Sequence, residues 1–444
     1  MLLWTDGLLP WAIWGRIFHE YEAYDFMKKK LIVTRLTRNQ REYTVCAFYQ
    51  DNRLLEVTAQ PEEENSILGN IYVGRVKDVV PSLNAAFIEI APGVPCYFSM
   101  EDLKNPVFVK KINSPRLVKG DELLVQVEKE SMKTKPPRVT TNLSFNGKYL
   151  VLTTGNRTLG ISKKLNGDVR ERLRRLLEME EALFGRNDVL PLPDSKTQQT
   201  TPSLYYGILA RTNSAAASEE EILSELALLK QQAESLIDKA PYQTCFSCVR
   251  KRKPEYLTAL QNAYTDQLEE IVTDKPELYD EMQQYLKDYQ PADLPKLRFY
   301  EDKLLPLAKC VSLEVKLEEA LQERVWLKNG GYLIIQPTEA LTVIDVNSGK
   351  SAAKGDVQKH YLKVNLEAAA EAAAQLRLRN ISGIIIIDFI DMASQEAREQ
   401  LMEALRIHTG KDPVPVQVVD MTKLNLVELT RKKVRKSLRE QFII

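Results

Sequence analysis

Two aspartates at the ends of apolar runs are the residues best suited to chemistry. Val343-Ile344 leads into Asp345, and the run 384–387 leads into Asp388. Such runs are typical of buried strands, and neighbouring strands would bring both carboxylates to one edge of a sheet. Adjacent carboxylates repel each other and need a cation, and Mg²⁺ usually takes one or two carboxylates plus a substrate phosphate. The pair predicts a magnesium site that could activate water against a phosphodiester.

Asn347 lies two positions beyond Asp345, so on an extended backbone it would point the same way. Its amide could donate a hydrogen bond to a phosphate oxygen or to an aspartate. The alternative is that each aspartate is a turn or helix cap, a common use of this residue after a strand. We expect that structural role for Asp391, near the start of a helix at 394–408. The residues alone leave both interpretations of the aspartate pair open.

An α/β pattern surrounds the two aspartates. A fully buried strand is expected at 384–387, and a basic helix at 431–439 follows the unit. The remaining elements are expected as helix 314–323, strands 331–335 and 340–344, alanine-rich helix 356–379, helix 394–408 and strand 414–419.

The preceding residues predict mainly strands, then helices. Residues 31–58 read as two short strands joined by a turn at 39–41, and short strands between 67 and 152 predict a small barrel. Ser218 with Glu221 forms a capping box that opens a helix to about Asp238. Residues 255–289 are helical by pattern and acidic.

Composition predicts a soluble globular protein of several domains. The chain has 444 residues, 44% hydrophobic and 27% charged, which favours two to four folded units. Its formal net charge is +0, so a polyanion site must come from local clusters of cations. The clusters are Lys28–Lys30, Arg250–Lys253 and Arg431–Arg439, and each, taken singly, is more often a solvated surface than a binding site.

Cysteine usage and the N-terminus point to the cytoplasm. Five scattered cysteines form no disulfide framework, which indicates a reducing compartment. The Cys245-x-x-Cys248 motif lacks a second pair of ligands, so buried thiols are favoured over zinc. Residues 1–26 hold three of four tryptophans but are too interrupted for a signal peptide or membrane span. We expect an appendage, or a mis-assigned start before Met27.

Longer ordered motifs resemble the ribonuclease E/G family. They are Val325–Ile335, Thr338–Gly349, Asn365–Ala369, Gln375–Arg379 and Gly383–Met392, and weaker similarity extends from about residue 30 to the C-terminus. The resemblance implies a magnesium-dependent endoribonuclease that hydrolyses single-stranded RNA, with a preference for AU-rich sequence, to 5′-phosphate and 3′-hydroxyl ends in RNA processing and decay. In such an enzyme Asp345 and Asp388 hold the metal and Asn347 supports them.

The same resemblance implies an α+β multidomain fold. An OB-fold RNA-binding barrel is inserted in an RNase H-like unit, followed by a 5′-sensor region and an α/β DNase I-like catalytic subdomain. The implied division is an N-terminal extension at 1–27, RNase H-like parts at 28–66 and 245–320, the OB-fold at 67–148, the sensor region at 149–244 and the catalytic subdomain at 321–444.

The resemblance also assigns residues that hold RNA. Phe87 and Tyr97 would stack on bases and Lys135 would supply a cation, although aromatics on barrel strands are commonly core residues. Arg211 and Thr212 would sense a 5′-monophosphate. The continuation after Thr212 is Asn213-Ser214-Ala215, where the family usually carries a glycine, so a plain loop before the capping box is the alternative.

Two further expectations concern assembly and rival functions. The family's zinc link uses a cysteine pair after the catalytic unit, and no cysteine follows Cys310 here. We therefore expect any homo-oligomer to form without that link. The rival functions are a non-catalytic RNA-binding protein of the same fold, acting in ribosome or messenger RNA regulation, and a DNA nuclease with the same metal chemistry.

Overall fold

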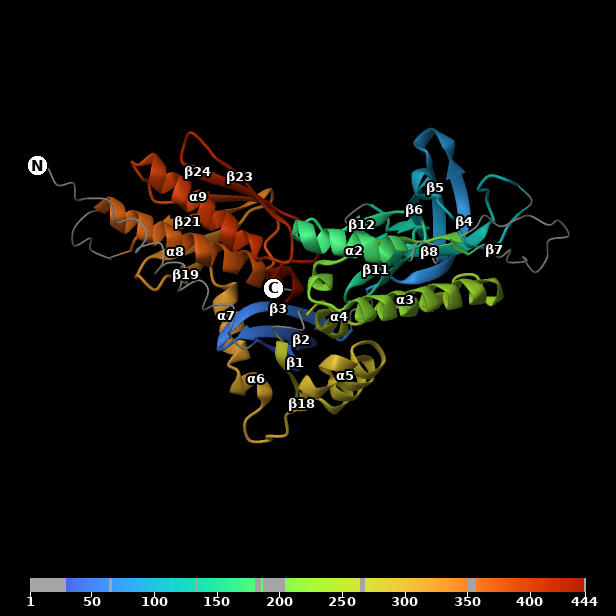
Figure 1. Ribbon diagram of the computed structural model, residues 1–444, viewed down its shortest axis with the longest axis horizontal. Helices are drawn as coiled ribbons and strands as arrows, with labels where there is room; N and C mark the ends of the chain where they lie inside the picture. Colours follow the sequence, from blue (N-terminus) through green and yellow to red (C-terminus); the bar gives the residue numbers. More distant parts are fainter. Residues whose placement is uncertain are drawn as a thin grey trace, which may run out of the picture. The chain divides into compact units, whose positions relative to one another are not determined.

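The computed structural model divides the chain into two compact units (Figure 1). We call residues 1–63 with 265–444 the two-sheet unit and residues 64–264 the barrel unit. The structure describes residues 29–63, 66–112, 114–131, 135–179, 185–186, 204–263, 268–349 and 357–442. The expectations for residues 1–27 therefore lie outside the described residues. None of the helices in these ranges has the length and apolar character needed to span a membrane.

The first sheet of the two-sheet unit joins distant parts of the chain. β17 pairs in parallel with β1, and the sheet order is β18-β17-β1-β2-β3. Asn39 and Gln40 link β1 to β2 with φ of 50° and 62°, the left-handed conformation of a two-residue hairpin loop. The strands are β1 Lys29–Arg38, β2 Arg41–Gln50, β3 Arg53–Pro61, β17 Leu268–Thr273 and β18 Leu297–Phe299.

Two sequence expectations for this region were wrong. Residues 29–61 form three strands rather than two, because a second tight turn follows β2. The segment expected to be helical throughout instead contains β17 between α4 Glu255–Asn262 and α5 Pro276–Tyr289. Ile271 and Val272 are β-branched and buried, so pairing with β1 prevails over the surrounding helical pattern.

Short helices complete the hydrophobic core against this sheet. Leu307, Leu317 and Phe442 are buried in one cluster with residues of β1, β2 and β3. The Tyr43 and Phe442 rings lie 5.1 Å apart between centroids. The helices that contribute are α6 Leu307–Cys310, α7 Leu313–Leu321 and α10 Leu438–Gln441, and a 3-10 helix spans Pro291–Lys296.

The second sheet carries both aspartates and has six strands. α8 Val357–Leu378 and α9 Gln395–Gly410 lie side by side (Figure 1), and their apolar side chains share one core with Ile344, Ile385 and Ile387. β21 and β22 are parallel, and the other neighbouring strands are antiparallel. In sheet order the strands are β19 Arg324–Trp326, β20 Tyr332–Pro337, β21 Leu341–Asn347, β22 Gly383–Asp388, β24 Leu426–Arg431 and β23 Val416–Met421.

Only one face of this sheet is buried. Along β22, Ile385 and Ile387 are fully buried, whereas Ile384 is 51% exposed and Ile386 is half-buried. The expectation of a strand buried on both faces was therefore wrong. A run of four isoleucines does not distinguish one covered face from two, because β-branched residues also suit a half-exposed strand. We call the face opposite α8 and α9 the open face.

The expected basic helix at 431–439 is instead a strand end, a turn and the short helix α10. Arg431 is buried, and its Nε lies 2.8 Å from an Asp412 carboxylate oxygen, while its Nη1 donates to the Asn380 side chain. Arg435 pairs with the half-buried Glu56. Arg431 and Arg435 thus form ion pairs with carboxylates inside the protein. These two arginines have a structural role and do not belong to a solvated cationic helix.

The barrel unit contains a closed five-stranded barrel. β4, β5, β6, β9 and β8 follow one another, and β8 pairs back to β4, which closes the barrel and is consistent with an OB-fold. A Cβ on Gly74 would lie 2.6 Å from the Ile88 side chain, so glycine permits the close approach of strands there. The strands are β4 Ile71–Val80, β5 Ala85–Ala91, β6 Val94–Ser99, β7 Phe108–Lys110, β8 Glu122–Lys129, β9 Arg138–Thr140 and β16 Cys248–Arg250.

A smaller sheet and two helices pack beside the barrel in the same unit. α3 Glu219–Lys239 begins at Ser218 with the expected capping box, in which Ser218 and Glu221 exchange hydrogen bonds. Apolar residues of α2 Gly167–Met179 and α3 share a core with Ile71 and Leu124 of the barrel. The sheet order is β10 Ser144–Asn146, β11 Leu150–Thr153, β15 Gly207–Ala210 and β12 Leu159–Ile161, and β13 Gly185–Arg186 pairs with β14 Leu204–Tyr205.

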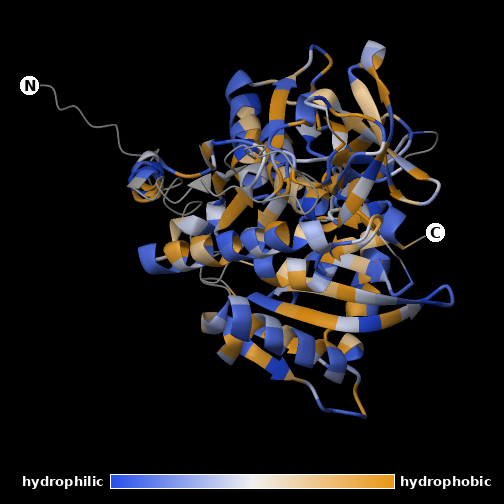
Figure 2. Ribbon diagram, turned by 90° about the vertical axis from the view of Figure 1, so that its right-hand side faces the viewer, coloured by the Kyte–Doolittle hydropathy of each residue, from blue (hydrophilic) through white to orange (hydrophobic). Residues whose placement is uncertain are grey.

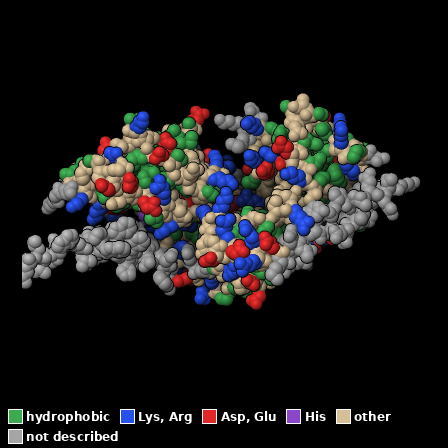
Figure 3. Space-filling view, turned by 45° about the horizontal axis from the view of Figure 1, so that its top comes forward, with side chains coloured by type: hydrophobic (Ala, Val, Ile, Leu, Met, Phe, Trp, Pro, Cys, Tyr) green, Lys and Arg blue, Asp and Glu red, His purple; other side chains and the backbone are tan. Residues whose placement is uncertain are grey.

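The sequence prediction of a mixed α+β protein with a small barrel is confirmed. Hydrophobic and hydrophilic residues alternate along many strands and helices (Figure 2), as expected for elements that bury one face. Acidic and basic side chains are interspersed on the surface shown in Figure 3, in agreement with the net charge of +0.

We predict that Asp412→Ala destabilises the six-stranded sheet by about 3–5 kcal/mol, because it leaves the buried Arg431 guanidinium without its carboxylate. Hydrogen exchange of the β22 and β24 amides would measure this loss within the two-sheet unit. The control is the double variant Arg431→Met, Asp412→Leu, which removes both charges and should cost much less. A single variant no less stable than the double variant would contradict the assignment.

Candidate active site

Asp345 and Asp388 face each other across two parallel strands. They are direct partners in the pairing of β21 with β22, so their side chains leave the sheet on the same face. The preceding residues Ile344 and Ile387 are fully buried, and both aspartates are exposed on the open face. The structure therefore brings together the two carboxylates that the sequence singled out.

Asn347 holds the first carboxylate in place. Its Nδ2 donates to Asp345 Oδ2 at 2.7 Å, and both residues belong to β21 with side chains on the same face. Asp345 therefore lies within a strand, and the alternative of a turn or cap does not apply to it. The amide oxygen of Asn347 is the atom of that side chain that could also act as a metal ligand.

Burial and neighbouring negative charges both act on the pKa of Asp388. The pKa of Asp388 is raised above its ordinary value, first by partial burial, then by the negative charges of Asp345 and Asp391. Asp391 accepts a hydrogen bond from Asn425 Nδ2 at 2.8 Å, which ties the segment after β22 to the β23–β24 hairpin. Ser394, rather than Asp391, caps α9. The expected helix cap is therefore not the role of Asp391 in this structure, and its side chain instead accepts the hydrogen bond from Asn425.

The donor set suits a cation shared with a substrate. Within the described ranges no three His, Cys, Asp or Glu side chains are grouped to hold a metal ion, so a cage made only of protein ligands is not formed there. Two exposed carboxylates that repel each other, with an amide beside them, leave room for ligands from elsewhere. Mg²⁺ commonly binds in this way, through one or two carboxylates and substrate phosphate.

A second candidate surface lies on the barrel. Phe87 and Tyr97 are cross-strand partners on β5 and β6, with ring centroids 6.4 Å apart in an edge-to-face arrangement. Both are half-buried, whereas Ile88 and Phe98, the next residue along each strand, are fully buried. The two rings therefore project from the outer face of the barrel, and they are not part of its core.

Two cations lie on or just before β9, the strand that pairs with β6. Lys135, expected from the sequence, is exposed just before β9. Arg138 was not anticipated, yet it is the register partner of Tyr97, and its Nη2 lies 2.8 Å from Asp102. Arg138 is brought beside Tyr97 by the parallel pairing of β6 with β9, and no pattern in the sequence indicates that pairing.

Arg211 and Thr212 lie where β15 ends and a 3-10 helix, Thr212–Ala215, begins. Arg211 donates to the Gly147 carbonyl and to Asn262 Oδ1, both at 2.6 Å. The hydroxyls of Thr212 and Ser162 are 3.1 Å apart. The two residues are thus fixed by neighbouring polar groups of the barrel unit.

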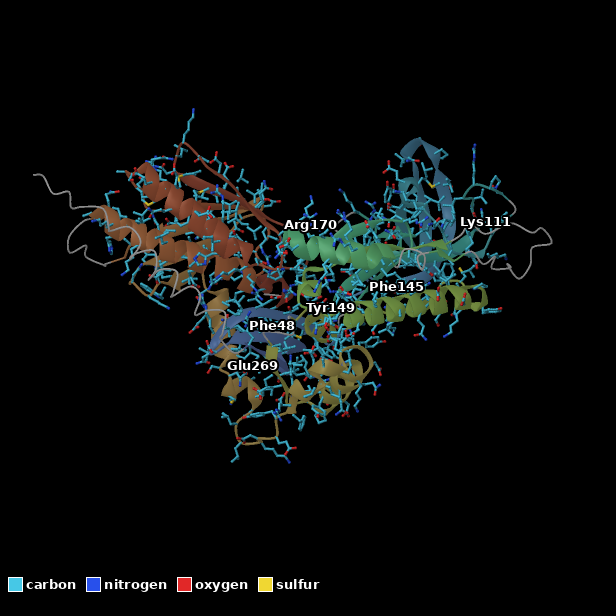
Figure 4. All side chains as sticks on the ribbon, in the orientation of Figure 1. Phe48, Lys111, Phe145, Tyr149, Arg170 and Glu269 are labelled. Carbon is cyan, nitrogen blue, oxygen red and sulfur yellow. The ribbon has the colours of Figure 1, made fainter. Side chains whose placement is uncertain are left out.

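Glu225, which the sequence analysis did not single out, binds the backbone of residues 148–150, next to the Gly147 carbonyl that Arg211 contacts. Glu225 accepts the backbone N–H groups of Lys148, Tyr149 and Leu150 at 2.7, 2.8 and 2.7 Å. Tyr149 is labelled in Figure 4. Burial raises the pKa of Glu225, and these hydrogen bonds and the charge of Arg211 oppose that rise. Glu225 lies on α3, some 75 residues after residues 148–150 in the chain, so only the tertiary fold brings the two together.

Other sequence candidates are placed outside these clusters. Cys248 is exposed and Cys245 is half-buried, so the expectation of buried thiols was wrong. Within the cluster at 250–253, Arg252 pairs with Glu255, and Lys253 donates to Gln261. Burial, followed by the charge of Arg250, lowers the pKa of Lys253 to about 8. These cations are largely engaged with the protein itself.

Comparison with known proteins gives one family. The family model described as "Ribonuclease E/G family" matches residues 144–434. A ribonuclease E of Nostoc sp. is 31% identical over 94% of this chain and 57% of its own length. A ribonuclease E of Haemophilus influenzae is 29% identical over 93% of this chain and 42% of its own length. A ribonuclease G of Escherichia coli is 30% identical over 89% of this chain and 78% of its own length. The chain thus spans about half the length of the ribonuclease E relatives.

We predict that Asp345→Asn lowers the pKa of Asp388 toward the ordinary aspartate value of about 3.9, because it removes one of the two neighbouring charges that raise it. At pH values between the ordinary aspartate pKa of about 3.9 and the raised pKa of the folded state, Asp388 holds a proton that the unfolded chain has already released. Its contribution to stability therefore falls as pH rises above about 3.9 through the raised pKa. Carboxyl carbon NMR of metal-free protein would measure the shift. An unchanged Asp388 titration in the variant would show that the carboxylates do not interact.

Proposed function

This chain belongs to the ribonuclease E/G family, and from that premise we propose that it is a magnesium-dependent endoribonuclease acting on single-stranded RNA. The observation that carries the proposal is the register pairing of Asp345 with Asp388 on the open face, with Asn347 bonded to the first. The proposed products carry 5′-phosphate and 3′-hydroxyl ends, and the proposed processes are RNA processing and decay in the cytoplasm.

The residues of the chain have distinct tasks in this mechanism. Asp345 and Asp388 would hold magnesium, and the hydrogen bond from Asn347 fixes the orientation of the Asp345 carboxylate. When bound, the metal supplies positive charge to the phosphate and makes water a better nucleophile. The open face lets an RNA backbone reach the carboxylates, since side chains of this face are exposed or half-buried. Asp388 binds a cation only in its ionised form, and its raised pKa, caused first by burial and then by the charges of Asp345 and Asp391, opposes that ionisation.

The barrel unit would hold the RNA strand. Phe87 and Tyr97 present ring surfaces on which unpaired bases can stack. Arg138 is the register partner of Tyr97, and Lys135 lies just before the same strand, so both would be available to phosphates. Arg211 and Thr212 would bind a 5′-monophosphate, because a guanidinium fork and a hydroxyl are suitable donors. We also propose that the chain has the family's division into an OB-fold, a 5′-sensor region, an RNase H-like unit and a DNase I-like catalytic subdomain. A homo-oligomer is a further proposal.

One assay separates this enzyme from a non-catalytic RNA-binding protein and from a DNA nuclease. The purified full chain is incubated with 5′-monophosphorylated RNA, 5′-triphosphorylated RNA and single-stranded DNA of one sequence, with and without magnesium. Magnesium-dependent cutting of RNA supports the proposal. RNA binding without cleavage would support the non-catalytic RNA-binding protein instead. Cleavage of the DNA in preference to the RNA would support the DNA nuclease.

We predict that Asp345→Asn and Asp388→Asn each reduce RNA cleavage by more than about 100-fold, because loss of residues that merely support metal ligands already costs 10–100-fold. RNA binding, measured by fluorescence anisotropy, should be largely retained, since the aromatic pair of the barrel is untouched. The matched control is Asp420→Asn, which removes an exposed aspartate from β23 of the same sheet and should cleave normally. Undiminished cleavage by either active-site variant would exclude the assigned site.

We predict that Arg211→Lys reduces the preference for 5′-monophosphorylated over 5′-hydroxyl RNA by about tenfold, because lysine cannot supply a planar pair of donors. Cleavage rates on the two RNAs would measure the ratio. A circular RNA, which has no 5′ end, should be cut equally by variant and wild type. Arg175→Lys, in an exposed arginine of α2, is the matched control. An equal loss on circular RNA would indicate damage to the fold instead of the 5′-end site.

A further inference from the structure

The open face of the six-stranded sheet carries an aromatic pair as well as the carboxylates. Trp326 on β19 is the register partner of Tyr332 on β20, and Tyr332 is the partner of Asn347 on β21. Register partners in antiparallel strands project from the same face, so both rings share the face of Asn347 and Asp345. The sheet itself aligns these residues.

The tryptophan is unusually accessible for its size. Trp326 is 64% exposed, while Tyr332 is half-buried beside it, with centroids 5.3 Å apart and planes at 63°. A single exposed apolar side chain is ordinary on a protein surface. Here the exposed ring is supported edge-to-face by a second ring and occupies the face that holds the acidic pair, which distinguishes it from a scattered surface residue.

An arginine completes the cluster. The Arg324 guanidinium carbon lies 5.6 Å from the Trp326 ring centroid and 4.7 Å from that of Tyr332. Arg324 pairs in register with Ile334, which pairs with Asp345. Two strand spacings separate β19 from β21, so Trp326 lies about 10 Å across the sheet from Asn347. The cluster is therefore close to the carboxylates without touching them.

We propose that Trp326, supported by Tyr332 and Arg324, forms a base-stacking subsite for an unpaired nucleotide that lies beside the phosphate held at Asp345 and Asp388. The inference rests on the proposed endoribonuclease function. A nucleobase is the ligand that fits, because its flat π surface matches the indole ring and the nearby guanidinium can meet the adjoining phosphate. The carboxylates alone repel a polyanion, and stacking offsets that repulsion with an uncharged contact.

The subsite would also select for strand type at the cut. A base that is paired in a duplex is stacked on its neighbours and is not available to Trp326. A strand must therefore be unpaired at this nucleotide to gain the contact. Since the contact is made both before and during cleavage, its loss should raise KM and leave kcat nearly unchanged.

Trp326 fluorescence can report on the contact without any cleavage. The full chain with Trp4→Phe, Trp11→Phe and Trp14→Phe keeps Trp326 as its single tryptophan. Single-stranded RNA is added in the absence of magnesium, and anisotropy of a labelled RNA follows binding separately. We expect quenching by single-stranded RNA and little by the same RNA annealed to its complement. Saturated binding with unchanged fluorescence would overturn the subsite alone, whereas no binding at all would overturn the proposed function with it.

Kinetics test the same contact in the active enzyme. Trp326→Ala should raise KM about tenfold, a typical loss for one base–aromatic stack, while Trp326→Phe keeps a ring and stays near wild type. The matched control is Phe299→Ala, since Phe299 is 38% exposed and lies edge-to-face with Tyr279 at 5.6 Å on the other sheet of the same unit. It should cleave normally.

An abasic nucleotide moved stepwise along the RNA locates the stacked base. Wild type should show a raised KM at one position near the cut, and Trp326→Ala should show no additional loss there, because the contact is already absent. Equal losses in both proteins, or a Trp326→Ala enzyme with wild-type KM, would overturn the subsite. If the wild-type protein does not cleave intact RNA at all, the result counts against the proposed function.

Discussion

The pairing of β21 with β22 places two like charges next to each other, and the site depends on that arrangement. The backbones of Asp345 and Asp388 are held side by side, because the preceding Ile344 and Ile387 pack in the core that the sheet shares with α8 and α9. The pKa of Asp388 is raised, first by partial burial and then by the negative charges of Asp345 and Asp391. A rigid apolar layer on one face thus maintains an unfavourable charge pair on the other, and a cation shared with substrate would relieve it.

Much of this region could be predicted from the sequence, because its local signals agree with its tertiary structure. The apolar runs before Asp345 and Asp388, the Asp-x-Asn spacing and the alanine-rich helix each lead to the observed elements. The start of α3 could also be predicted from local sequence, because the side chains of Ser218 and Glu221 form the capping box that begins the helix. The aromatic partners Phe87 and Tyr97 were also identified, although only the strand register shows that they meet. Their roles toward RNA are proposals.

The remaining features depend on contacts that no local pattern encodes. β17 is a strand because β1, more than 200 residues earlier, offers it a partner. Arg431 is buried because Asp412 and Asn380 receive it, although its sequence neighbours indicate a solvated basic segment. Glu225 orders a loop some 75 residues earlier in the chain. The position of Trp326 on the same face as Asn347 could not be predicted from the sequence, because it depends on the order and register of β19, β20 and β21.

The parallel pairing of β1 with β17 also bears on how the chain is made. A ribosome adding about 5–20 residues per second completes β17 roughly 10–50 seconds after β1. During that interval β1 to β3 form an incomplete sheet with an unpaired edge, while every segment of the barrel unit emerges in one continuous stretch. The barrel unit can fold first, and the nascent two-sheet unit must stay protected from mispairing until its distant partner strand arrives.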